Sequence, residues 1–111
     1  MMLFIKNSNM RVKKLDKKFT KKGDVFTQIE IGDNYYIYKR DIGDFSCYEI
    51  FEKKIVAIND YMRRYDLTGK YNEFDAYEQY PSDEHFGHWA YCCSNFEKTR
   101  KYIYMFNNEN D

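Results

Sequence analysis

The sequence predicts an α+β fold, in which a three- to four-stranded antiparallel sheet packs against one long C-terminal helix. Three observations support this prediction: residues 25–51 follow the two-residue period of strands, turn residues interrupt that period twice, and a helical period follows Pro81. The chain has 111 residues, enough for one hydrophobic core, so we expect a single domain over residues 1–111.

The predicted sheet is a meander of three strands. Residues 25–31 alternate apolar or β-branched side chains with others, which is the period of a half-buried strand. Turn residues 32–34 follow, and residues 35–40 form the returning strand. A second turn over residues 41–44 leads to a third strand over residues 45–51.

The predicted helix starts near Ser82, because Pro81 disfavours the helical conformation at Tyr80 and Ser82 can cap a first turn. It is expected to run to the asparagines at 107–110 and to cover one face of the sheet. Its apolar stripe consists of Phe86, Trp89, Ala90, Cys93, Phe96, Ile103 and Tyr104. Trp89 is therefore expected to be buried, and Arg100, on the same stripe, must reach solvent or meet a carboxylate.

Three segments are less defined by their pattern. Residues 1–10 fit a short strand or an unstructured start, and residues 11–22 fit a helix and an extended arm equally well. Residues 54–79 form a variable segment, which begins as a strand or a short helix and contains a loop over residues 66–72.

Charge and cysteine content restrict the class of protein. The net charge is zero, but residues 1–23 form a basic arm with eight Lys or Arg residues and one acid, Asp16. The three cysteines are an odd number without framework spacing, which predicts reduced thiols in a cytoplasm. No segment approaches the length of a membrane span, so we expect no membrane partner.

The reactive and ionisable residues of the sequence do not form a catalytic pattern. No Ser, His and acid occur at suggestive spacing and no glycine-rich loop is present, so we expect no enzyme and no cofactor. Glu49, among apolar strand residues, is expected to form a structural ion pair, with Arg100 if the two faces meet.

A metal site is not expected. His85, His88 and Cys92 are weak candidates, because their spacing on a helix points three ligands one way and only Cys47 offers a further sulfur. Two exposed histidines beside a half-buried thiol is the preferred interpretation.

Several pieces of the chain resemble small uncharacterised proteins encoded by bacteriophages and prophages. The pieces are Lys18-Phe19-Thr20-Lys21-Lys22-Gly23, Tyr48-Glu49-Ile50-Phe51 and Tyr80-Pro81-Ser82-Asp83-Glu84-His85-Phe86-Gly87, in that order. The resemblance implies a phage origin and a location in the cytoplasm of the bacterial host. It implies no activity.

These observations favour a non-enzymatic module that binds an unknown protein partner, such as a host or defence protein. The alternative is a single-stranded nucleic-acid-binding protein that uses a Tyr-rich sheet and the basic arm. The candidate binding residues are Lys13, Lys14, Lys17, Lys18, Tyr36, Tyr38, Arg40, Tyr91 and Tyr102.

Overall fold

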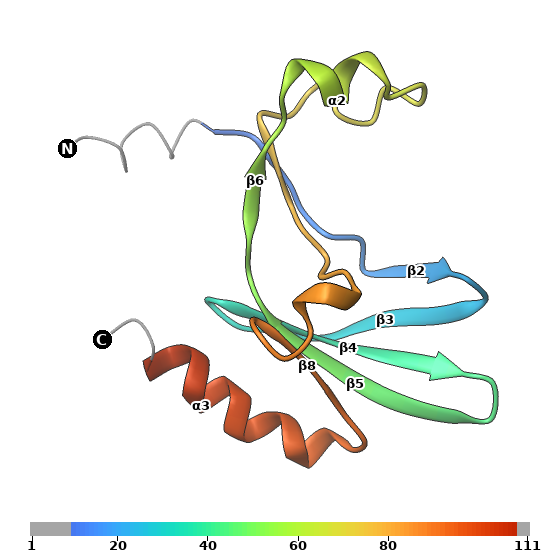
Figure 1. Cartoon of the computed structure of the whole chain (residues 1–111), viewed down its shortest axis with the longest axis vertical. Coiled ribbons are helices and arrows are strands. Elements are labelled where there is room, and N and C mark those ends of the chain that lie inside the picture. Colours follow the sequence, from blue (N-terminus) through green and yellow to red (C-terminus); the bar gives the residue numbers. More distant parts are fainter. Residues whose placement is uncertain (1–9, 109–111) are drawn as a thin grey trace. The chain divides into compact units, whose positions relative to one another are not determined.

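The structure, a computed structural model, describes residues 10–108, which fall into two compact units (Figure 1). We call residues 16–53 and 81–108 the sheet unit, and residues 10–15 and 54–80 the small unit. The single domain expected over residues 1–111 stays a prediction. Compact units are recognised by their internal contacts, whereas a domain is defined by its ability to fold independently. Residues 1–9 lie outside the described residues. The strand considered for residues 1–10 therefore also lies outside them, apart from Met10.

The sheet unit contains one antiparallel sheet of five strands. Its order is β2-β3-β4-β5-β8, with β2 at Lys18–Lys21, β3 at Asp24–Ile31, β4 at Tyr35–Ile42, β5 at Phe45–Glu52 and β8 at Ala90–Cys93. The predicted meander is confirmed as β3, β4 and β5. The predicted sheet was too small, because β2 and β8 add one strand at each edge.

The basic arm is extended where it joins this sheet, which makes the helical alternative for residues 11–22 wrong. Lys22 and Gly23, with φ of 54° and 88°, make the tight turn that pairs β2 with β3. The Phe19 ring then stacks on Phe26 at 4.8 Å between centroids. An aromatic pair across two strands outweighs the weak helical spacing of this segment.

The long C-terminal helix is also wrong in its first half. Ser82 does cap a helix, but η1 spans only Asp83–His85, and Gly87 then adopts φ 95°, which a helix does not accommodate. The chain next forms β8 on the edge of β5. A short helix η2, Phe96–Thr99, leads into α3, Arg100–Asn108. Asn95 caps this second start, where its side chain accepts a hydrogen bond from the Lys98 N–H at 3.0 Å.

One face of the sheet is covered by α3, as Figure 1 shows within the sheet unit. The buried cluster there is Ile37, Ile50, Cys93 and Phe106. Phe106 is 0% exposed, whereas Tyr104, expected on the buried stripe, is 73% exposed. The helix turns a different face to the sheet than the long periodicity indicated, because it begins at residue 100 and not near residue 82.

The opposite face holds a second group of apolar residues. Tyr38 stacks on Phe51 with centroids 5.8 Å apart, and Phe51 meets the edge of the Trp89 ring at 6.4 Å. Trp89 is half-buried, so the expectation of a buried tryptophan on the inner stripe of a helix is wrong. Trp89 lies in the turn before β8, and part of its side chain is accessible to solvent.

The small unit contains a mixed sheet of order β1-β7-β6. Its strands are β1, Val12–Lys13, β6, Ile55–Ala57, and β7, Ala76–Glu78; β1 pairs with β7 in parallel, and β6 pairs with β7 antiparallel. Helix α2, Asp60–Arg64, follows β6, so the variable segment holds both a strand and a short helix. The predicted loop over residues 66–72 is confirmed, and the Arg63 guanidinium bonds the Tyr71 and Phe74 carbonyls near it at 2.8 and 2.7 Å.

The helices of the described residues are all too short or too polar to cross a membrane.

Replacing Phe106 with Ala should lower the free energy of unfolding by about 3–5 kcal/mol, because the ring is fully buried between α3 and the sheet. Urea denaturation followed by circular dichroism measures this change. The matched control is Tyr104→Ala on the same helix, which should stay within about 0.5 kcal/mol of the parent because Tyr104 is exposed. Equal effects of the two substitutions would contradict the placement of α3.

Candidate functional site

The outer surface of α3 presents an exposed tyrosine between two hollows. Tyr104 lines both of them. The first, of about 530 Å³, is lined by Lys101, Tyr102, Tyr104, Met105 and Asn108. The second, of about 380 Å³, is lined by Glu30, Tyr35, Arg100, Ile103 and Tyr104. We call these the apolar hollow and the charged hollow.

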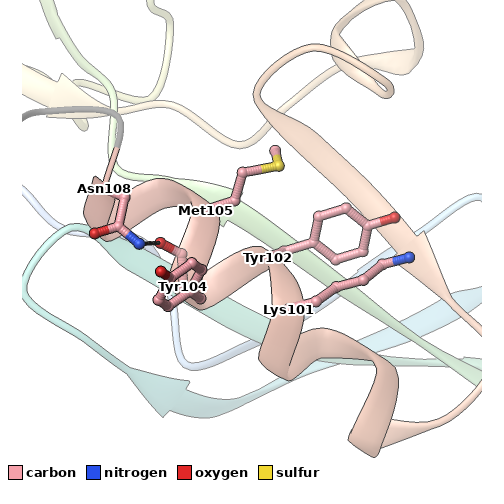
Figure 2. A pocket seen from close by; sticks show the side chains of 5 residues that line it. All are labelled: Lys101, Tyr102, Tyr104, Met105 and Asn108. Atoms are coloured by element: carbon pink, nitrogen blue, oxygen red, sulfur yellow. Dashed lines mark hydrogen bonds between the residues drawn. The ribbon is translucent and has the colours of Figure 1, made fainter.

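The apolar hollow is built on fixed side chains of α3 (Figure 2). Tyr102 stacks on Tyr91 of β8, with ring centroids 4.1 Å apart and ring planes 12° from parallel. Lys101 runs beside Tyr102, with its Nζ atom 5.0 Å from the ring centroid. The Asn108 side-chain amide turns back and donates to the Tyr104 carbonyl at 2.9 Å. Among the described residues that line this hollow, Lys101 carries the only charge, and it is a cation.

The charged hollow is organised by Glu30 on β3. The Tyr35 hydroxyl donates a hydrogen bond to its carboxylate, and the Arg100 Nη2 atom lies 2.9 Å from the Glu30 Oε2 atom. These hydrogen bonds, first from Tyr35 and then from Arg100, lower the pKa of Glu30. Burial, together with the Glu30 carboxylate, raises the pKa of Tyr35. The expectation that Arg100 meets a carboxylate is confirmed, but its partner is Glu30 and not Glu49.

Glu49 forms its ion pair with Arg40 on the opposite face of the sheet. The Arg40 Nη1 atom lies 3.0 Å from Glu49 Oε2, and its Nη2 atom lies 2.7 Å from Asp24 Oδ2. Hydrogen bonds to Asp24 and Glu49 raise the pKa of Arg40. Glu49 is 3% exposed, so a structural pair is the arrangement that burial of this carboxylate requires.

Two cysteines lie beside this ion pair. The ligand atoms of Cys47, Glu49 and Cys92 all lie within 4.8 Å of one another. Burial, then the neighbouring Cys92 thiol and the Glu49 carboxylate, raises the pKa of Cys47 to about 12. A pocket of about 240 Å³ adjoins them, lined by Arg40, Glu49, Asp83, Phe86 and Cys92.

The histidines proposed as weak metal candidates do not join Cys92. The His85 Nδ1 atom accepts a hydrogen bond from the Ser82 backbone N–H at 3.1 Å, and its ring lies 4.7 Å from the Trp89 ring. His88 is exposed, and its carbonyl accepts a hydrogen bond from Tyr91. The alignment of His85, His88 and Cys92 on one helix face is wrong, because residues 86–93 are not helical. Cys47, named from the sequence as the further sulfur, does lie beside Cys92.

The candidate binding residues separate into buried and accessible groups. Tyr36 and Tyr38 are 2% and 0% exposed, and the Tyr38 hydroxyl donates to the Asp16 carbonyl at 2.6 Å. These rings are therefore closed to a ligand. Tyr91 stacks on Tyr102, which lines the apolar hollow, and Arg40 is paired with Asp24 and Glu49. Of the four candidate lysines, Lys14, Lys17 and Lys18 are exposed, and Lys13 is half-buried in β1.

The sequence prediction did not include Lys101, Tyr104 and Met105, which line the apolar hollow, among the candidate binding residues, and it placed Tyr104 on the buried stripe. The error follows from one long helical register, in which Tyr104 shares a stripe with Ile103. The signal that gives the correct register is Asn95, a capping residue after which only a short helix remains.

No protein-family model, curated protein or solved structure matches the chain.

Replacing Glu30 with Gln should reduce stability in a pH-dependent way. Because the folded pKa of Glu30 is lowered, its contribution is fully present above the unfolded value, near 4.5, and is lost as the pH falls through the folded value. The difference in unfolding free energy between the parent and E30Q should be largest at neutral pH and should shrink in acid. Urea denaturation at several pH values measures it.

The control for this experiment is Asp44→Asn, which removes an exposed carboxylate in the turn between β4 and β5. A difference for E30Q that grew as the pH fell would contradict the hydrogen-bonded carboxylate.

The three thiols should differ in their rates of alkylation by iodoacetamide at neutral pH. Cys92 is exposed and should be labelled first. Cys47 should be slow because its raised pKa leaves little thiolate, and Cys93 should be slow because it is buried and burial raises its pKa. Peptide mass spectrometry over time measures the three rates. Labelling of Cys93 as fast as Cys92 would show that β8 does not pair with β5 as described.

Proposed function

We propose that this protein is a non-enzymatic protein-binding module whose contact surface is the outer face of α3. The observation that supports the proposal is the position of Tyr104, which is 73% exposed between the apolar and the charged hollows. Tyrosine is favoured at binding hot spots, where a ring fills the space between neighbouring pockets.

The surface around Tyr104 is held in place before a partner arrives. Phe106 anchors α3 to the sheet, and the stack of Tyr102 on Tyr91 ties the helix to β8. The ion pair between Arg100 and Glu30 ties it to β3. A surface fixed in this way loses little side-chain freedom when it binds, which favours affinity.

The chemistry of the apolar hollow defines the partner. The hollow is walled by Tyr102, Tyr104 and Met105, and its charged group is Lys101. In addition, α3 contains no Asp or Glu. The partner segment that fits this surface carries an apolar side chain for the hollow and a carboxylate for Lys101.

The resemblance to phage and prophage proteins gives the expected source of that partner. A phage protein in an infected cell meets host proteins, including those of host defence. The partner is thus a bacterial protein with an exposed acidic and apolar segment.

The alternative function, binding to single-stranded nucleic acid, is less well supported by the structure. Base stacking on a sheet needs exposed aromatic rings, and Tyr36 and Tyr38 are buried. The exposed lysines at 14, 17 and 18 remain, but such runs are most often solvated surface. A fluorescence titration with single-stranded oligonucleotides tests this function directly, and tight binding would favour it over the proposed one.

Replacing Tyr104 with a photo-crosslinking phenylalanine derivative should give one specific adduct with a protein of the bacterial host. The matched control carries the same derivative at Phe45, which is 63% exposed in the same unit but at the far end of β5. The adduct is identified by mass spectrometry, and the purified partner is then titrated against the unmodified protein.

In that titration, Tyr104→Ala should weaken binding by roughly 30-fold, the effect of a hot-spot residue worth about 2 kcal/mol. Phe45→Ala should change the dissociation constant by less than about threefold. Equal crosslinking from both positions, or equal affinity of Y104A and the parent, would overturn the proposed surface.

A further inference from the structure

A second group of residues, on the face of the sheet away from α3, is not used by the proposed binding surface. It consists of two thiols and a carboxylate on two paired strands: Cys47 and Glu49 on β5, and Cys92 on β8. We propose that Cys47, Glu49 and Cys92 bind a divalent metal ion of the zinc class. The site is separate from Tyr104 and is independent of the proposed function.

The strand register brings the three side chains together. Glu49 lies directly opposite Cys92 in the pairing of β5 with β8. Cys47 is two residues before Glu49, so both side chains point to the same face of the sheet. The result is that all three ligand atoms lie within 4.8 Å of one another.

These distances suit a tetrahedral ion after small side-chain rotations. A zinc ion about 2.3 Å from two sulfur atoms holds those atoms roughly 3.8 Å apart. Thiolate and carboxylate together are ligands that zinc accepts, whereas magnesium and calcium prefer oxygen alone. The neighbouring pocket of about 240 Å³, which Asp83 also lines, leaves room for a water molecule as the fourth ligand.

Arg40 is the cation nearest to this group, and its charge does not prevent binding. Its guanidinium is already matched by Asp24 at 2.7 Å and Glu49 at 3.0 Å. Binding replaces the two thiol protons of Cys47 and Cys92, which pass to solvent, by one doubly charged ion. The net charge of the group is therefore unchanged, and no oxidation or reduction takes place.

The consequence of binding is a link between an edge strand and its neighbour. The strand β8 has only four residues, and it connects η1 to the segment that leads into α3. An ion that binds β5 and β8 in the folded state, and does not bind the unfolded chain, stabilises the folded state by an amount that grows with the logarithm of the free ion concentration.

In the test, the reduced 111-residue chain is titrated with Co²⁺, whose near-ultraviolet charge-transfer band reports thiolate ligands, and the Co²⁺ is then displaced with Zn²⁺. We expect one ion per chain, a band of the intensity of two thiolates, and a higher midpoint of thermal unfolding with Zn²⁺. The main variant is Cys92→Ser, because Cys92 is exposed and its loss should leave the fold intact. It should lose half of the band and weaken Zn²⁺ binding by at least about tenfold.

Two further variants keep the result interpretable. Glu49→Gln should weaken Zn²⁺ binding by at least about tenfold while both thiolates still give the band. Cys93→Ala is the matched control, because Cys93 is the next residue on β8 but lies on the opposite face, under α3. It should bind Co²⁺ like the parent. A parent protein without the band, an unchanged band in C92S, or loss of the band in C93A would overturn the site.

Discussion

The pairing of β8 with the edge of β5 is the interaction on which the rest of the sheet unit depends. It sets Cys93 opposite Tyr48 and Cys92 opposite Glu49, so one strand supplies both faces of the sheet. On one face, Cys93 completes the apolar cluster that receives Phe106 of α3. On the other face, Cys92 meets Cys47 and Glu49. Both candidate sites therefore depend on the same short strand.

Two arginines of this unit pair with buried or half-buried carboxylates, one on each face of the sheet. Arg40 serves Asp24 and Glu49 on one face, and Arg100 serves Glu30 on the other. Each arginine also lies over an aromatic ring, Arg40 over Phe26 and Arg100 over Phe96. A guanidinium that is charge-matched and lies over a ring can be partly removed from water at low cost, which explains why Arg40 tolerates its half-buried position.

The aromatic residues divide between core and surface according to strand and helix register. Alternation along β4 sends Tyr36 and Tyr38 to the side of Phe51, and sends Tyr35 toward α3. The buried Tyr38 keeps its hydroxyl satisfied by Gln28 and Asp16. On α3, Tyr102 packs on Tyr91, while Tyr104 points away from the core. Of these tyrosines, the two on α3 are available for recognition because both line the apolar hollow.

The sequence by itself determined the α+β class and the β3-β4-β5 meander, because alternation and turn residues act between neighbours in the chain. It also indicated that Ser82 caps a helix, that Glu49 needs a charged partner, and that Arg100 reaches solvent or meets a carboxylate. Those inferences depend on local geometry or on the cost of burying a charge, both of which can be read from residue type.

Only the tertiary structure decided where the C-terminal segment becomes a strand and which groups meet. Residues 90–93 fit a helical stripe as well as they fit a strand, and the open edge of β5 selects the strand. That choice shortens the final helix and turns Tyr104 to solvent. Glu49 and Arg100 do not pair with each other: Glu49 pairs with Arg40, and Arg100 pairs with Glu30. The physical reason is that strand pairing is a long-range interaction: the partner of residue 92 is residue 49, and no local pattern near either residue specifies it.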